Sequence, residues 1–272
     1  MTDMIIFLIA IAVLFLLYLW NLRCRNGHPG LSALRGWLYA HRGLHGNGVP
    51  ENSMAAFRLA LDAGCGIELD IHLMADGNLA VIHDPSLKRT AGADVHIEDL
   101  TAAELSQYPL EDTSETIPLF SEVLELYAGQ APLIIELKPE RGNHADLCAA
   151  ACKAMEGYQG AWCMESFDPR CVYWLKKNRP DIIRGQLAEN FFRTKTSTLP
   201  WHLKLVMSKH LTNFLTRPDF LAYKFADRRN LGLQLSRKIW KTQGVTWTVK
   251  TPEDLKAAQK EGYLPIFEGF VP

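Results

Sequence analysis

Hydrophobic and polar positions follow two different patterns along the chain. From Met4 to Trp20, seventeen residues carry no charge, and at a rise of ~1.5 Å per residue they make about 26 Å of helix, close to the minimum for a bilayer span. Beyond residue 36, short apolar runs alternate with longer amphipathic stretches. The first pattern predicts a membrane anchor, and the second predicts strands that alternate with helices.

The repeated order of strand and helix indicates a parallel sheet. About eight such units in roughly 235 residues fit a (β/α)8 barrel of the TIM type better than an open sheet. Helices are expected at 52–63, which begins like a capped helix, and at 252–262, which has Pro at its start and Gly at its end. The predicted strands lie in 37–41, 66–71, 132–137, 161–166, 181–187, 220–225, 244–249 and 264–267.

One segment breaks this order. Asp76-Gly77 separates two apolar runs at a spacing that is typical of a β-hairpin and not of a helical crossover. A hairpin here would bring His83 back beside Glu68 and Asp70.

The residues around the apolar span favour an uncleaved anchor over a signal peptide. Asp3 precedes the span, whereas Arg23 and Arg25 follow it, and no Lys or Arg lies before it. The positive-inside rule then places the rest of the chain in the cytoplasm, held to the cell membrane by a single pass. We expect an anchor at 4–22, a Gly- and Pro-containing linker at 23–36 and one domain at 37–272. A cleaved signal peptide remains the alternative.

Composition limits the partners. With 48% hydrophobic and 22% charged residues the chain can bury a large core, and a formal net charge of -1 gives no general attraction to nucleic acid. Electrostatic recognition must therefore be local. Residues 189–241 are rich in aromatic and basic side chains, which would suit either anionic lipid headgroups or an ordinary solvated helical face.

The first candidate functional group is His41-Arg42-Gly43, at the end of the first predicted strand. The carboxyl ends of barrel strands form the active-site face, so position matters here as much as residue type. His41 can transfer a proton near neutral pH, and Arg42 can direct two donors onto a phosphate. Taken alone, the tripeptide is more typical of a surface turn.

Acidic residues at the ends of two further strands predict a metal site. Glu68 and Asp70 are two positions apart, so a strand directs both toward one side, and Glu136 ends another strand with Lys138 two positions later. Adjacent carboxylates repel each other unless a cation lies between them, which favours a hard divalent ion such as Ca²⁺ or Mg²⁺. A simple ion pair between Glu136 and Lys138 is the alternative.

A second histidine, His83, follows the predicted hairpin. Phosphodiester hydrolysis needs both a general base and a general acid, because one oxygen loses a proton while another gains one. His41 and His83 are therefore the predicted proton-transfer pair. The other nearby histidines, His45, His72 and His96, are interpreted as ordinary surface or core residues.

These motifs, in this order, resemble those of the glycerophosphodiester phosphodiesterase family, and the chain looks like a membrane-anchored, bacterial-type member. The resemblance covers residues 37–270 and includes matches at 87–90, 117–119, 166–168 and 247–249. Its main motifs are His41-Arg42-Gly43, Pro50-Glu51-Asn52-Ser53, Glu68-Leu69-Asp70, His83-Asp84 and Glu136-Leu137-Lys138.

The resemblance implies a TIM-type barrel that hydrolyses glycerophosphodiesters to sn-glycerol 3-phosphate and an alcohol. In that family the neighbouring glycerol hydroxyl is thought to attack phosphorus, giving a cyclic phosphate that water opens. The implied metal ligands are Glu68, Asp70 and Glu136, and the implied acid and base are His41 and His83. Arg42, Lys138 and Trp247 would contact the substrate, and Glu51 would position the glycerol or a metal ligand.

Two departures concern the substrate. Lys250 replaces the usual Asn after Trp-Thr-Val, and the usual acidic ending is replaced by residues 267–272. The alcohol therefore stays open, and lysophospholipids at the membrane are candidates besides soluble diesters. Two other functions also stay open: a catalytically silent, membrane-tethered barrel that binds lipid headgroups or partners, and a phosphoinositide-type phospholipase C.

Overall fold

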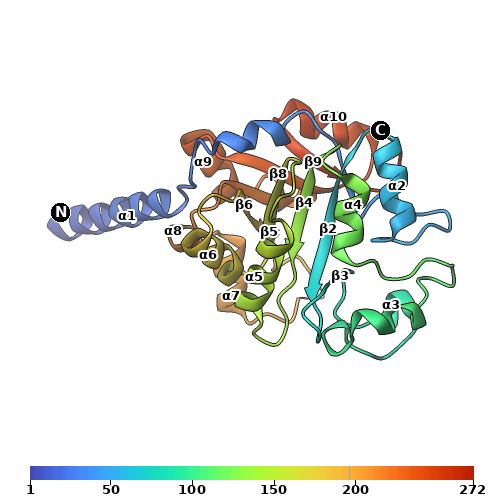
Figure 1. Cartoon of the computed structure of the whole chain (residues 1–272). Coiled ribbons are helices and arrows are strands. Elements are labelled where there is room, and N and C mark those ends of the chain that lie inside the picture. Colours follow the sequence, from blue (N-terminus) through green and yellow to red (C-terminus); the bar gives the residue numbers. More distant parts are fainter. Residues whose placement is uncertain (196) are drawn as a thin grey trace.

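The computed structural model describes residues 1–195 and 197–272, in which eight parallel strands close into a barrel surrounded by helices (Figure 1). Each of the eight predicted runs overlaps a barrel strand, so the TIM-type fold is confirmed. The parallel strands are β1 (Tyr39–His41), β2 (Gly66–Leu73), β4 (Leu133–Leu137), β5 (Trp162–Ser166), β6 (Arg184–Ala188), β7 (Phe220–Lys224), β8 (Gln243–Val249) and β9 (Tyr263–Phe267).

Strand β1 closes the barrel, because it pairs with β2 on one side and with β9 on the other. The predicted hairpin is also present. Strand β3 (Leu79–Val81) runs antiparallel to β2, with Ile71 opposite Val81, and returns the chain to the carboxyl end of the barrel.

Helices follow most strands and cover the outside of the barrel. The predicted helix at 52–63 begins later than expected, because Ser53 is its N-cap and accepts a hydrogen bond from the amide of Ala56. The helices are α1 (Thr2–Asn21), α2 (Met54–Asp62), α3 (Lys88–Ala91), α4 (Phe120–Tyr127), α5 (His144–Ala154), α6 (Pro169–Asn178), α7 (Trp201–Ser208), α8 (Asn213–Thr216), α9 (Leu231–Trp240) and α10 (Pro252–Lys260), with 3-10 turns at Pro29–Leu34, Ile97–Asp99, Ala102–Gln107 and Phe225–Asp227.

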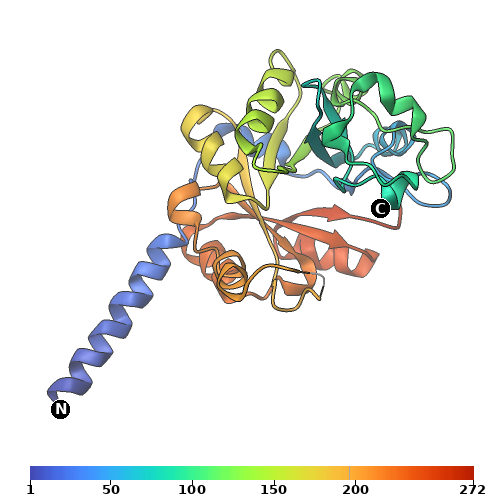
Figure 2. The same ribbon diagram turned by 90° about the horizontal axis from the view of Figure 1, so that it is seen from below.

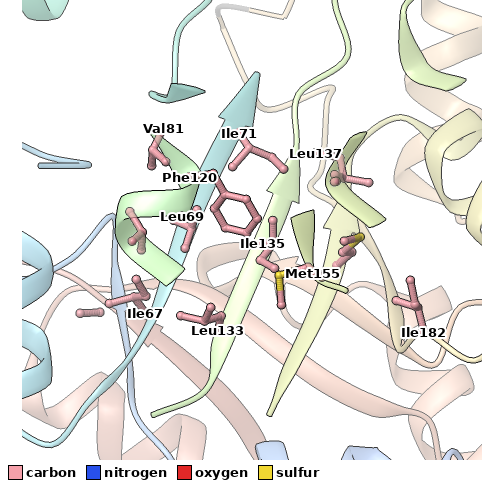
Figure 3. Packing of buried hydrophobic residues seen from close by; sticks show 14 of the residues in the cluster. Ile67, Leu69, Ile71, Val81, Phe120, Leu133, Ile135, Leu137, Met155 and Ile182 are labelled. Atoms are coloured by element: carbon pink, nitrogen blue, oxygen red, sulfur yellow. The ribbon is translucent and has the colours of Figure 1, made fainter. Parts of the chain in front are cut away.

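Strand alternation separates the apolar core from the functional side chains. On β2, Ile67, Leu69 and Ile71 point outward and pack under the helices, as Figure 3 shows together with Phe120 of α4. The intervening Glu68 and Asp70 therefore point into the barrel. Toward the amino-terminal end, the barrel interior is filled by large side chains such as Tyr39, Ile134 and Phe220. The carboxyl end is left for polar groups.

Helix α1 is long and apolar enough to cross a membrane and projects from the domain (Figures 1 and 2). The segment 23–36, which we expected to be a linker, packs on the domain. Arg25 forms two 2.6 Å contacts with the buried carboxylate of Asp219, and Leu31 and Leu34 are buried against the amino-terminal side of the barrel. A bidentate ion pair and two buried leucines hold this segment on the domain despite its glycines.

Candidate active site

The predicted site residues converge at the carboxyl end of neighbouring strands. His41 is paired in register with Glu68, and Asp70 is paired with Glu136. His83 lies just beyond β3, and its neighbour Ile82 donates its amide to the carbonyl of Asp70 over 3.1 Å. A narrow recess is lined by His41, Arg42, Glu68, His83, Glu136, Glu165, Phe167, Leu187, Trp247 and Ile266.

Three carboxylates form a group that fits a divalent cation. Glu68, Asp70 and Glu136 are all buried, and each offers one oxygen such that these oxygens lie within 4.8 Å of one another. Burial, and then the charges of Asp70 and Glu136, raise the pKa of Glu68 well above its usual range. Burial of three acids around one point is costly without a compensating positive charge, and an all-oxygen donor set suits Ca²⁺ or Mg²⁺.

Lys138 supplies part of the positive charge. Its ammonium group lies 2.9 Å from Glu136 Oε1 and 3.2 Å from Asp70 Oδ1. Burial raises the pKa of Asp70, but the charges of Lys138, His83 and Arg42 outweigh it and hold this pKa well below its usual range. The ion pair between Glu136 and Lys138, which was the alternative to a metal site, is thus present, and it lies inside the carboxylate group.

His41 is held in one orientation by Glu268. The imidazole Nδ1 lies 2.6 Å from Glu268 Oε2, and Nε2 points toward Glu68 Oε2 at 3.8 Å. Because a carboxylate can only accept, Nδ1 carries the proton and Nε2 is the nitrogen available for proton transfer. Burial lowers the pKa of His41, and the hydrogen bond to Glu268 opposes that decrease. His45 lies beside this pair.

His83 has an equivalent partner, its neighbour in the sequence. Its Nδ1 lies 2.6 Å from Asp84 Oδ1, and this hydrogen bond lowers the pKa of the Asp84 carboxyl. Arg89 contacts Asp84 and also Glu51, whose Oε1 lies 2.6 Å from Arg89 Nη2. His72 is a core residue, as expected, and its Nε2 lies 3.2 Å from the carbonyl oxygen of His83. Both proton-transfer candidates are therefore held through Nδ1 by a carboxylate.

Arg42 connects the first motif with the carboxylates. Its Nη1 donates to Glu51 Oε1 at 2.9 Å, and its Nε lies 3.4 Å from Asp70 Oδ2. Asn52, at φ 54°, donates to Asp70 Oδ2 at 3.0 Å. The segment 50–53 therefore orients both Arg42 and Asp70, in addition to starting α2.

Trp247 forms one wall of the recess. Its ring packs edge-on against Phe167, with centroids 5.5 Å apart, and Lys224 lies 5.9 Å from its ring centroid. Its indole Nε1 is buried and has no hydrogen-bond partner among the described residues. A second pocket, of about 290 Å³, adjoins the recess, with which it shares His83 and Phe167, and is also lined by Lys138. A substrate thus has room beyond the narrow recess.

Two carboxylates of the site, Glu165 and Glu268, were not predicted from the sequence. Glu165 of β5 is paired in register with Glu136, is fully buried and lines the recess, and burial raises its pKa well above the usual range. Alternation within 161–166 could have identified it, since Glu165 and Cys163 share the inward face. Glu268 lies in residues 267–272, which we interpreted only as a departure from the family's usual ending. Its contact with His41 forms because the last strand pairs with the first.

Comparison with known proteins gives these features a context. Residues 41–268 match the model of the glycerophosphoryl diester phosphodiesterase family. A glycerophosphodiester phosphodiesterase of Caldanaerobacter subterraneus is 30% identical over 236 residues, which is 82% of this chain and 89% of that protein. A lysophospholipase D of Rattus norvegicus is 37% identical over 112 residues, but this match covers only 36% of this chain and 35% of that protein.

The fold has solved counterparts as well. A phosphodiesterase of Oleispira antarctica, solved with sn-glycerol 3-phosphate, superposes with a TM-score of 0.72 at 24% identity and covers 90% of this chain and 95% of that one. The family match extends from His41 to Glu268, the two residues that meet where the barrel closes. The chain therefore belongs to the glycerophosphoryl diester phosphodiesterase family, a family of phosphodiester hydrolases.

Proposed function

We propose that the chain hydrolyses glycerophosphodiesters to sn-glycerol 3-phosphate and an alcohol, with a divalent cation held by Glu68, Asp70 and Glu136. The observation that carries this proposal is a recess lined by two carboxylate-bound histidines and by Glu68 and Glu136, which form one buried carboxylate group with Asp70. A protein that only bound headgroups would have no need for two imidazoles held in this way.

His41 and His83 transfer the protons. In each, a carboxylate holds Nδ1, so that Nε2 is directed away from its partner and can exchange a proton with the substrate. One imidazole removes the proton from the attacking hydroxyl, and the other gives a proton to the oxygen that leaves. The pH dependence of turnover distinguishes which histidine has which role.

Arg42 and Lys138 bind the phosphate. Both are bound to carboxylates of the site, which fixes their positions before substrate arrives. The bound cation would supply further positive charge for the non-bridging oxygens. The indole N–H of Trp247 is a donor for the substrate, and Glu51 positions Arg42 through their 2.9 Å contact.

The test is choline release from glycerophosphocholine by the full chain in detergent, with Ca²⁺ or Mg²⁺ and then with EDTA. We expect choline and sn-glycerol 3-phosphate in equal amounts, abolished by EDTA and by His83→Asn in a protein with an unchanged circular dichroism spectrum. No release by the folded wild type would favour the silent lipid-binding barrel. Phosphocholine and glycerol as products would indicate the cleavage of a phospholipase C.

We further propose that lysophospholipids are substrates at the membrane. The support is the partial match to a lysophospholipase D together with an apolar helix next to the catalytic domain. Choline release from lysophosphatidylcholine in mixed micelles, compared with glycerophosphocholine at equal concentration, tests this preference. A higher kcat/KM for the soluble diester would restrict the enzyme to deacylated substrates.

For the location, we propose that α1 is an uncleaved membrane span with the barrel in the cytoplasm. The support is the pair of arginines after the span and the hydrogen bonds between its last turn and the barrel, since Asn21 donates to the carbonyl of His210 at 2.9 Å. In spheroplasts, protease added from outside should leave the domain intact. N-terminal analysis of the mature protein should show that α1 is retained. A product that has lost α1 would indicate a signal peptide.

A further inference from the structure

Exposed apolar side chains are concentrated in one part of the described chain. After residue 21, eleven large hydrophobic residues are exposed, and nine of them lie between Tyr173 and Ile239. In α7, Trp201 is 70% exposed and Leu205 is 38% exposed, and Ser208 is the helix's buried residue. An eight-residue helix gains little stability by itself, so exposed apolar groups on it indicate a missing partner surface.

Helix α9 begins beside the end of α7, because its N-cap residue Asn230 donates to the carbonyl of Ser208 at 3.1 Å. Leu231 is 63% exposed and Ile239 is 45% exposed, and their spacing of eight residues places them on one side of the helix, next to the exposed Lys238. We call the exposed face made by Trp201, Leu205, Leu231, Lys238 and Ile239 the α7–α9 surface.

The charge of this region is one-sided. Residues 190–241 contain eleven Lys or Arg and two acids, Asp219 and Asp227, which are both buried and pair with Arg25 and Arg193. The whole chain has 29 basic and 30 acidic residues, so this separation is local and does not follow from composition. Apolar groups surrounded by bases fit a partner that offers both hydrocarbon and negative charge.

Helix α1 is fixed to the same elements. Tyr18 donates to the carbonyl of Lys209 at the end of α7, and Trp240 of α9 donates to the carbonyl of Leu19 at 2.8 Å. A Cβ at Gly232 would lie 2.5 Å from the Tyr18 hydroxyl, so this glycine allows α9 to touch α1. The last turn of α1 is therefore part of the domain and not the start of a flexible tether.

Aromatic and arginine side chains surround the point where α1 leaves the domain. The guanidinium of Arg217 lies 4.6 Å from the ring centroid of Trp20, and that of Arg23 lies 5.8 Å from the ring centroid of Trp240. Trp, Tyr and basic residues are typical of the boundary between hydrocarbon and headgroups. The membrane boundary therefore falls at the last turn of α1, level with its contacts to α7 and α9. Figure 1 shows α1 leaving the domain beside α8 and α9.

We propose that the α7–α9 surface lies on the anionic leaflet that α1 enters, so that the membrane holds the catalytic domain in one orientation. This inference rests on the proposed membrane span. Trp201 and Leu205 insert among the acyl chains near the headgroups, and the surrounding bases contact lipid phosphates.

The experiment uses the full chain, one copy per nanodisc, with a polarity-sensitive fluorophore on a single introduced cysteine. The six native cysteines are buried, so labelling is selective for Leu205→Cys or, as a second site, Trp201→Cys. The matched control is Lys256→Cys, exposed on α10, and Leu8→Cys reports insertion of α1. Spin-labelled lipid quenches fluorophores that touch the bilayer. Discs contain phosphatidylcholine with phosphatidylglycerol, or phosphatidylcholine alone.

We expect quenching at Leu8, Leu205 and Trp201 but not at Lys256. Quenching of the two α7 labels should be stronger in the anionic discs and reduced near 1 M salt, where the screening length is about 3 Å. A quenched Leu8 label with unquenched labels on α7 would overturn this inference and leave the anchor intact. An unquenched Leu8 label would overturn the anchor as well. An α7 fluorophore that reports a less polar environment only with two copies in a disc would overturn the lipid contact and assign the surface to a dimer.

Discussion

Replacing Glu268 by Gln tests how the site controls His41. Glu268 Oε2 accepts the Nδ1 hydrogen of His41 over 2.6 Å, and the imidazole side chain is only 14% exposed. Burial lowers the pKa of His41, and the carboxylate opposes this by stabilising the imidazolium. Gln keeps an acceptor oxygen of the same reach but removes the negative charge. The substitution thus changes the electrostatics of His41 with little change in its position.

The size of the effect follows from the type of hydrogen bond. A bond to a charged group contributes about 1.5–3 kcal/mol and a neutral one about 1 kcal/mol, so the variant loses about 1–2 kcal/mol of imidazolium stabilisation. At 1.36 kcal/mol per pKa unit, the pKa of His41 falls by about one further unit. A similar loss at the transition state would lower kcat/KM about tenfold.

The assay is the pH profile of kcat/KM for glycerophosphocholine. If His41 is the base, the acidic limb moves about one pH unit lower; if it is the acid, the alkaline limb moves lower instead. Either shift identifies the role of His41. Glu253→Gln, an exposed neutral substitution on α10, should leave the profile unchanged. A Glu268→Gln enzyme with the wild-type profile, merely slower at every pH, would refute the electrostatic reasoning.

Four further predictions concern the metal site and the barrel. Saturating Ca²⁺ or Mg²⁺ at ~100 times its Kd should stabilise the fold by about 2.7 kcal/mol, seen as a higher Tm that Glu136→Gln removes. Glu165→Gln should weaken that metal about 10-fold in calorimetric titration, because an adjacent negative charge is lost; unchanged affinity would place Glu165 outside the metal's influence. Gly185→Ala should cost about 1–3 kcal/mol or more in urea unfolding, since its Cβ would lie 2.2 Å from the Phe220 ring. Burial lowers the pKa of His210 to about 4, so below pH 6.5 the unfolded chain binds one proton more than the folded chain. The free energy of unfolding should therefore fall by about 3 kcal/mol from pH 6.5 to pH 4. His210→Asn should remove this pH dependence, since Asn tolerates the local φ of 55°.

The barrel was predictable because strand and helix periods differ. Parallel strands buried on both faces give continuous apolar runs, and a polar residue inside such a run is conspicuous. That is why Glu68, Asp70 and Glu136 could be selected and placed on the inward face. The Asp-Gly turn was equally informative, because it predicted the return of His83 to the same end of the barrel.

Contacts across the barrel were less predictable. Glu268 meets His41 only because the last strand pairs with the first, and nothing local in the chain's ending indicates that partner. In the segment 23–36, by contrast, we expected a linker where the structure has specific contacts. Its glycines and proline suggested a free linker, whereas Arg25 finds a buried carboxylate 194 residues later in the sequence. Local composition describes how easily a segment bends and does not reveal what it binds.

The distribution of charge inside the barrel separates the requirements of folding from those of function. Toward the amino-terminal end the interior is filled by Tyr39, Phe220 and their apolar neighbours, as stability alone would favour. Toward the carboxyl end, Glu68, Glu136 and Glu165 occupy inward positions where leucine or valine would pack without a desolvation penalty. Folding does not explain three buried acids whose pKa values are raised by burial and by neighbouring carboxylates. A positively charged ligand bound in the finished structure would account for their retention, and this is the role that we propose for the metal.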